Sequence, residues 1–351
     1  MAGGIGSRFW PLSKQKSPKQ FLDILGTGKT LIQMTFERFS SVCPSENYYI
    51  VTNEQYRDLV LEQLPMLKPE QVLLEPIMRN TAPCIAYANY KIKQRNQNAH
   101  IIVSPADHLI TNETEFLNVI NEGLNFINDT DKLLTLGLKP NRPETGYGYI
   151  QVENHTEDLC ISKVKTFTEK PNLDLAKVFL NSGDFFWNSG IFIWSLSAIE
   201  AAFKTYLPDV DNLFARGGNI IDDNSEKKFI NEIYPECPNI SIDYGILEKS
   251  DKVHVFCADF GWSDLGTWGS LYDRSNKDES GNAIQGDNVM LYDSENCLIH
   301  VPKEKLVVVQ GIDNYIIVDS EDTLLICKKE HEQDIKTFVG DIKISKKNQF
   351  I

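Results

Sequence analysis

The feature that most constrains the fold is the alternation of strand-like and helix-like segments through the first two-thirds of the chain. Such β-α-β repetition predicts a mostly parallel sheet covered by helices on both faces. In sheets of this kind ligands bind at the carboxyl ends of strands, so functional residues are expected in the loops that follow strands. The strand patterns lie at 48–53, 71–76, 100–108 and 132–138, and the helical patterns between them at 81–94 and 113–127.

The pattern changes after a charged connector at 274–283. Beyond it, short β-rich runs are separated by turn residues at intervals of about eight to twelve residues, which is typical of a β-roll or β-helix. We therefore expect a Rossmann-like α/β domain over 1–280 and a small all-β domain over 281–351. The second stretch is too short for a generous core of its own, so we expect it to pack on the first.

Composition excludes several classes of protein. The 351 residues carry a formal net charge of −14, which argues against nucleic-acid or anionic-membrane binding. Any anionic ligand must then be held by a local group of cations. The seven cysteines form no CxxC pair, and no apolar run approaches the ~20 residues of a membrane span. We expect a cytoplasmic protein with reduced thiols.

The first residues, MAGGIGSRFWPLSKQKSPKQFL, form a loop suited to an anion. Gly3, Gly4 and Gly6 let backbone N–H groups face a ligand closely, and Arg8 and Lys19 add positive charge. The run is neither a Walker A loop nor a GxGxxG fingerprint, and its glycines alone fit a flexible turn. The following PKQFL, however, sets Lys19 between a proline and apolar residues, which indicates a fixed charge that suits a nucleoside triphosphate.

Two aspartates follow strands that lie far apart in the sequence. Asp107 stands in SPADH and Asp264 in GWSDLG. Each alone fits a turn or a helix cap. Together with the anion loop they predict a magnesium site, because Mg²⁺ takes one or two carboxylates and completes its shell with phosphate oxygens.

Two further polar corners adjoin strands. In FTEKP, the adjacent side chains of Glu169 and Lys170 point to opposite sides of a strand, so one can bind hydroxyls and the other an anion. In WNSGIFIW, Asn188 offers a donor and an acceptor to sugar hydroxyls. The aromatic residues around it fit a core.

In order and spacing these motifs resemble the sugar-1-phosphate nucleotidyltransferases, over essentially the whole chain. FWPLSK and EPIMRNTAP (75–83) are more similar to the guanylyl branch, which uses mannose 1-phosphate, than to the thymidylyl or cytidylyl branches. The resemblance implies a nucleotidyltransferase domain that converts GTP and mannose 1-phosphate into GDP-mannose and pyrophosphate with Mg²⁺.

The resemblance also implies a role for each site residue. Arg8, Lys19, Asp107 and Asp264 would be catalytic, and the two aspartates would hold Mg²⁺. Lys170 would bind the sugar phosphate, and Gly146, Glu169 and Asn188 the mannose. The nucleotide would be bound by Arg8 and Lys19 together with Ala2, Gly3, Gly4, Gly6, Arg79 and Asn80.

Two further expectations come from the family. Its glycine loop is fed by an apolar strand, so we expect such a strand upstream of Met1. Relatives also suggest a homodimer formed through a flat β edge of the C-terminal domain.

Two alternatives stay open. One is a relative that uses another sugar 1-phosphate or nucleotide, since the fold and metal site would be the same. The other is a non-catalytic sugar-nucleotide-binding subunit, which would be expected to lack one of Arg8, Lys19, Asp107 and Asp264, all of which are present.

Overall fold

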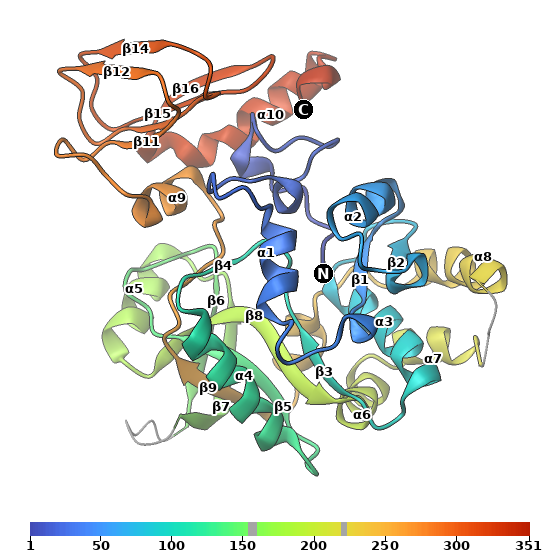
Figure 1. Cartoon of the computed structure of the whole chain (residues 1–351). Coiled ribbons are helices and arrows are strands. Elements are labelled where there is room, and N and C mark those ends of the chain that lie inside the picture. The colour runs from blue at the N-terminus through green and yellow to red at the C-terminus, as the bar shows by residue number, and fades with distance from the viewer. Residues whose placement is uncertain (154–159, 219–222) are drawn as a thin grey trace. The chain divides into compact units, whose positions relative to one another are not determined.

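The computed structural model describes residues 1–153, 160–218 and 223–351 of the chain (Figure 1). The chain divides into two compact units, each assembled from stretches that are far apart in the sequence. The first unit comprises Met1–Gly3, Arg38–Pro105 and Ile110–Trp262. The second comprises Gly4–Glu37, Ala106–Leu109 and Ser263–Ile351.

The first unit contains a two-stranded and a six-stranded sheet with their covering helices. Its strands are β1 (Ile50–Asn53), β2 (Val72–Glu75), β3 (His100–Val103), β5 (Leu133–Leu138), β6 (Gly148–Val152), β7 (Ile161–Glu169), β8 (Phe185–Ser195) and β9 (Val253–Ala258). Its helices are α2 (Arg57–Gln63), α3 (Thr81–Arg95), α4 (Glu113–Ile127), α5 (Leu173–Ser182), α6 (Leu196–Tyr206), α7 (Pro208–Ala215) and α8 (Asp223–Ile233). The short strands β4 (Leu109–Ile110) and β10 (Trp262–Ser263) lie where the chain passes from one unit to the other.

Strand direction in the larger sheet differs from the expectation. The order is β3-β8-β5-β9-β7-β6, and among its described strands only β5 and β9 are parallel neighbours. The α/β class is confirmed, but most pairs in this sheet are antiparallel. Two strands account for this. The eleven-residue strand β8 runs antiparallel to β3, β5 and β6, and β7 runs antiparallel to β9 and β6.

Helices cover both faces of this sheet, as expected from the alternating pattern. Neighbouring residues of a strand point to opposite faces. Leu133 of β5 therefore packs with residues of α3, α6 and α7, whereas Leu134 packs with residues of α4 and α5. Figure 1 shows α4 lying across its side of the sheet. No helix in the described ranges is long and apolar enough to cross a membrane.

Hydrogen bonds at the start of α3 hold two neighbouring segments in place. Asn80 is the N-cap of α3, and its side chain accepts a hydrogen bond from the Thr81 N–H at 2.9 Å. The Thr81 hydroxyl is left to accept from the N–H of Ile242 at 2.8 Å. That bond ties the π-helical turn Asp243–Leu247 to the beginning of α3.

The second unit contains the coiled β-strands expected near the end of the chain. β11, β13 and β15 are parallel neighbours, β12 pairs with β14 in parallel, and β16 is antiparallel to β15. The bounds are β11 (Ala283–Gln285), β12 (Val289–Tyr292), β13 (Leu298–His300), β14 (Val307–Gln310), β15 (Tyr315–Asp319) and β16 (Leu324–Lys328), with helices α1 (Leu31–Arg38), α9 (Trp268–Arg274) and α10 (Ile335–Ile344).

The opening loop is part of the core of this second unit. Phe9 and Trp10 are buried in one apolar cluster with Trp268, Ile316 and other residues of the coils. The Trp10 indole donates to the carbonyl of Phe350 at 2.7 Å, and the Trp268 indole donates to the carbonyl of Trp10 at 3.1 Å. Residues close to the end of the chain therefore hold the loop at its beginning.

Candidate active site

The glycine loop is closed around a lysine. Gly6 has a φ of +72°, and a Cβ there would lie 2.5 Å from the Cβ of Lys19. Only glycine fits both the conformation and the space. The N–H of Lys19 donates to the carbonyl of Ile5 at 3.2 Å, which closes the loop.

Lys19 is a buried cation that joins the two predicted magnesium ligands. Only 3% of the residue is exposed. Its Nζ donates to Oδ2 of Asp107 at 2.9 Å and to the backbone carbonyl of Asp264 at 2.6 Å. Both aspartates, predicted from separate strand ends, thus lie at one ammonium group.

Neighbouring positive charges favour the ionised form of Asp107. Burial opposes its ionisation, but the positive charges of Lys19 and His108 outweigh burial, so the pKa of Asp107 lies below its usual value. Asp264 stands at a sharp corner, since the next residue, Leu265, has a φ of +43°. Its Oδ1 accepts from the N–H of Gly266 at 2.9 Å, which fixes the carboxylate.

This donor set suits a magnesium–phosphate group. Within the described ranges, no cluster of three or more His, Cys, Asp and Glu residues is placed to hold a metal. Two carboxylates are what Mg²⁺ needs when phosphate oxygens supply the remaining ligands. In the same unit, Nε of Arg8 is buried and has no hydrogen-bond partner among the described residues. A buried donor of this kind is costly unless a ligand oxygen accepts from it.

The predicted sugar-binding residues belong to the first unit. Glu169 at the end of β7 pairs with Gly148 of β6, and the N–H of Lys170 donates to the carbonyl of Tyr147 at 3.1 Å. Gly146 directly precedes this segment. Lys170 has a φ of +48°, and its Nζ lies 2.8 Å from Oε1 of Glu169. The Lys170 side chain is 60% exposed, whereas that of Glu169 is only 12% exposed.

Asn188 is held by a partner that sequence reasoning missed. Its Nδ2 donates to Oδ1 of Asp243 at 2.8 Å, and its Oδ1 accepts from the Thr135 hydroxyl at 2.9 Å. Burial raises the pKa of Asp243 to about 6, with a further contribution from the negative charge of Glu169. Asp243 follows no strand but begins a π-helical turn, so the strand-end rule did not find it. The only signal in the sequence is an acid set among apolar residues in SIDYGIL.

The first residues of the glycine run lie beside β1. The N–H of Ala2 donates to the carbonyl of Val51 at 2.8 Å, and its carbonyl accepts from the Thr52 hydroxyl at 2.8 Å. A Cβ at Gly3 would lie 3.2 Å from Oε2 of Glu75, at the end of β2. Ala2 and Gly3 are therefore close to the beginning of the EPIMRNTAP segment.

That segment is anchored by buried groups. Glu75 accepts a hydrogen bond from the Tyr234 hydroxyl, and burial raises the pKa of Glu75 above its usual value. The Arg79 guanidinium donates to the carbonyl of Pro235, while its Nε is buried with no hydrogen-bond partner among the described residues. Asn80 is the α3 cap described above, at a φ of +68°.

The structure thus gathers the predicted residues into two sets, one in each unit. The second unit holds Gly4, Gly6, Arg8, Lys19, Asp107 and Asp264. The first holds Ala2, Gly3, Arg79, Asn80, Gly146, Glu169, Lys170 and Asn188.

Comparison with known proteins gives the family. Residues 1–281 match the nucleotidyl transferase family, and residues 287–342 match the mannose-phosphate isomerase/GMP-like β-helix domain. Mannose-1-phosphate guanylyltransferases of Klebsiella pneumoniae and Escherichia coli K12 are 37% and 35% identical to this chain. The matches cover 100% and 98% of this chain and 74% and 72% of those relatives.

A solved structure agrees over the whole chain. The crystal structure described as mannose-1-phosphate geranyltransferase from Thermus thermophilus superposes with a TM-score of 0.87 at 28% identity, covering 98% of each chain. The family resemblance found in the motifs is therefore confirmed. The chain belongs to the nucleotidyl transferase family and, within it, to the mannose-1-phosphate guanylyltransferases.

Proposed function

We propose that this enzyme transfers GMP from GTP to mannose 1-phosphate through the two sets of residues described above, with the help of Mg²⁺. Membership of the guanylyltransferase family supports the reaction. The observation that carries the residue assignment is the buried Lys19 ammonium, held between Asp107 and the Asp264 carbonyl under the glycine loop.

The reaction depends on the positioning of its two substrates more than on proton transfer. The nucleophile is a phosphate oxygen of mannose 1-phosphate, which is already ionised at neutral pH. It attacks the α-phosphorus of GTP in line with the departing pyrophosphate, and the bond from that phosphorus to the bridging oxygen breaks. The protein must therefore bring two polyanions together and stabilise the charge that develops between them.

In the second unit the triphosphate would be held by the backbone N–H groups of Gly4 and Gly6 and by Arg8 and Lys19. An ammonium group has three N–H donors. Asp107 and the Asp264 carbonyl accept from two N–H donors of Lys19, which leaves the third donor for a phosphate oxygen. Asp107 and Asp264 would hold Mg²⁺, which when bound supplies positive charge to the phosphate oxygens.

In the first unit the sugar 1-phosphate would be bound. Gly146, Glu169 and Asn188 would contact the mannose hydroxyls, and Lys170 would bind the phosphate. Asp243 acts as a positioning residue, because its hydrogen bond fixes the amide of Asn188. Ala2, Gly3, Arg79 and Asn80 would contact the nucleotide, and the buried Nε of Arg79 is a donor that a ligand oxygen can satisfy.

The proposal is tested by pyrophosphate release from four nucleoside triphosphates, each combined with several sugar 1-phosphates. We expect the highest kcat/KM for GTP with mannose 1-phosphate. A faster pair of substrates would replace this assignment, and no turnover with any pair would favour a non-catalytic binding subunit. Parallel purification of a Lys19→Ala variant controls for contaminating activity.

We also propose that the enzyme works in the cytoplasm and binds no nucleic acid.

We further propose that two chains form a homodimer through β16. β16 is at the edge of its sheet, and Leu324 and Ile326 on it are 58% and 57% exposed. Unpaired edge strands with apolar side chains favour pairing with another chain. Ile326→Lys should give monomers in light scattering, whereas Val178→Lys on α5, equally apolar and 60% exposed, should not. A dimer that survives Ile326→Lys contradicts this interface.

A further inference from the structure

Two cysteines of the first unit lie directly opposite each other on neighbouring strands. The first part of β7 pairs antiparallel with β9, with Ile161 opposite Phe256. One residue further along this register Cys160 is opposite Cys257, and the N–H of Cys257 donates to the carbonyl of Cys160 at 2.7 Å. Side chains of directly opposite residues point to the same face of a sheet, so the two thiols are neighbours.

The spacing of such a pair suits a disulfide bond. Opposite residues joined by backbone hydrogen bonds in an antiparallel pair have Cα atoms about 5.5 Å apart, within the range of about 4.4–6.8 Å found across disulfides. Their Cβ atoms are about 4.5–5.5 Å apart, compared with ~3.8 Å in a typical disulfide. The bond can therefore form if the strands close slightly, and the resulting strain makes it easier to reduce again.

The two thiols differ in their access to solvent. Cys160 is exposed, whereas Cys257 is half-buried. Cys257 packs against an apolar cluster that consists of Ile150, Val152, Phe186 and Val255. Burial raises the pKa of Cys257 to about 12, with a further contribution from the Cys160 thiol nearby. An external reagent should therefore react first at Cys160, because Cys257 is less accessible and rarely ionised.

The other five cysteines, all within the described ranges, are less accessible than Cys160. They are buried or half-buried: Cys43, Cys84, Cys237, Cys297 and Cys327. Since oxidation of thiols follows their exposure, we expect a mild oxidant to select Cys160 among the seven.

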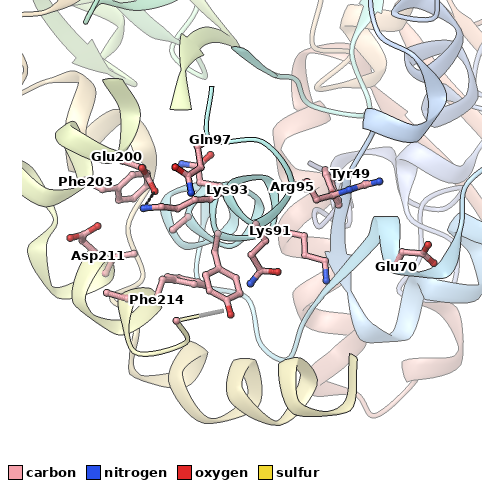
Figure 2. Close-up of a pocket in the computed structure, with 17 residues that line it drawn as sticks. Tyr49, Glu70, Lys91, Lys93, Arg95, Gln97, Glu200, Phe203, Asp211 and Phe214 are labelled. Carbon is pink, nitrogen blue, oxygen red and sulfur yellow. Dashed lines mark hydrogen bonds and ion pairs between the residues drawn. The ribbon is translucent and has the colours of Figure 1, made fainter. Parts of the chain in front are cut away.

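The first unit also contains a cavity of about 830 Å³, with walls mainly from α3, α6 and α7 (Figure 2). Lys93 and Glu200 in its lining form an ion pair at 2.8 Å (Figure 2). Its lining, as far as the chain is described, includes neither a cysteine nor a residue assigned to the reaction. The cavity is therefore not part of the cysteine site.

We propose that Cys160 and Cys257 form a site of reversible oxidation by low-molecular-weight disulfides such as oxidised glutathione. The Cys160 thiolate attacks one sulfur of the external disulfide, the S–S bond of which breaks, and one glutathione leaves and takes up the proton that Cys160 lost. The Cys257 sulfur then attacks Sγ of Cys160, and the second glutathione leaves with the proton of Cys257. The two cysteines lose two electrons in all, and oxidised glutathione is reduced to two thiols.

The fold favours the second of these steps. The sheet keeps the two cysteines opposite each other, so attack by Cys257 is intramolecular and needs no further encounter. Excess reduced glutathione reverses both steps. This reversibility agrees with the expectation of reduced thiols, because disulfides of cytoplasmic proteins are usually transient.

The test uses the full chain, and its readout is covalent, so it does not depend on the proposed reaction. The folded protein is incubated with oxidised glutathione, quenched with acid, unfolded, alkylated and digested for mass spectrometry. We expect the main product to be an internal disulfide between Cys160 and Cys257, with no lasting glutathione adduct at Cys160. Dithiothreitol should restore both thiols.

The variant Cys257→Ser separates the two steps. It removes the second sulfur, so the reaction should stop at a glutathione adduct of Cys160 that is at least about tenfold more abundant than in the unmodified chain. Cys43→Ser, which replaces another half-buried cysteine, is the matched control and should still form the internal bond. Cys160→Ser lies at an exposed position, so it should fold even if Cys257→Ser does not, and its Cys257 should stay unmodified.

Four results would each overturn the proposal. They are no reaction at Cys160, a lasting glutathione adduct there in the unmodified chain, a bond from Cys160 to any other cysteine of the same or a second chain, and an internal bond that forms only after the protein has been unfolded in urea. The first three are read from the unmodified chain and need no variant.

Discussion

Two lysines that the sequence predicts as phosphate ligands have opposite surroundings. The Lys19 side chain is 4% exposed and bonded to two oxygens of its own unit, whereas the Lys170 side chain is 60% exposed and paired with Glu169. A buried cation is part of the fold, because its removal leaves its acceptors unpaired. An exposed cation can be lost with little effect on folding. Substitution of Lys19 should therefore affect both folding and activity, whereas substitution of Lys170 should affect activity alone.

The largest effect is expected for Lys19→Ala. Loss of a fixed positive charge at the triphosphate should lower kcat by about 100- to 1,000-fold. Because the Asp107 side chain left without its partner is 34% exposed, the free energy of unfolding should also fall by a smaller amount than for a fully buried pair, about 1–3 kcal/mol. Pyrophosphate release and urea unfolding measure the two effects. Lys16→Ala, in the exposed part of the same loop, is the control. A Lys19→Ala protein as stable as this control would show that the buried lysine contributes no more to folding than an exposed one.

Asp264→Asn should separate metal binding from folding. The amide oxygen of asparagine can still accept from Gly266, so we expect an unchanged Tm. Turnover at saturating Mg²⁺ should fall by about 100-fold or more, since a neutral amide holds the cation poorly. Asp273→Asn on the exposed side of α9 is the control. Near-normal turnover in a folded Asp264→Asn protein would refute the metal assignment.

Asp243 predicts a pH dependence of stability that is opposite in sign to that of Asp107 beside Lys19, whose lowered pKa makes the folded state more stable as the pH rises. Its pKa is about 6 in the folded protein and 3.8 ordinarily, so between these values the folded state binds more protons than the unfolded state. The free energy of unfolding should therefore fall as the pH rises from about 4 to 6, by up to about 3 kcal/mol. Urea unfolding across this range measures it.

The variant Asp243→Asn supplies the control for that measurement. It removes the titrating group but keeps an oxygen for the Asn188 amide, so the fall in stability over this pH range should become smaller. An identical pH profile in both proteins would show that another group is responsible.

The smallest effect is expected for Lys170→Ala. The KM for mannose 1-phosphate should rise about tenfold, as for the loss of one charged hydrogen bond, while the KM for GTP and the Tm stay the same. Steady-state kinetics with each substrate varied in turn gives both constants. Lys177→Ala on the exposed face of α5 should change neither. Equal rises in both KM values would contradict a role confined to the sugar phosphate.

The sequence predicted those parts of the site that depend on local chain chemistry. Gly6, Lys19, Asp107 and Asp264 were found because glycine loops and strand-end acids have local signatures, and the structure brings all four into one unit. Their roles in binding and catalysis stay predictions, as does the boundary near residue 280.

Features that depend on long-range pairing could not be predicted. Asp243 is a partner of Asn188 only because the turn that bears it packs against β8 from 55 residues away. The direction of β8 is likewise decided by its neighbours in the sheet and not by its own residues, since alternation of side chains is the same in parallel and antiparallel strands. Local periodicity contains neither kind of information.

The hydrogen bond from the Trp10 indole to the Phe350 carbonyl has a consequence for synthesis of the protein. Trp10 leaves the ribosome 340 residues before Phe350. At about 5–20 residues per second this separates the two by roughly 17–70 seconds. During that interval the glycine loop lacks most of its apolar partners, because Trp268 and the β-coils are also made late. We therefore expect the glycine loop to become protected from proteases on the nascent chain only after Trp268 and the β-coils have been made.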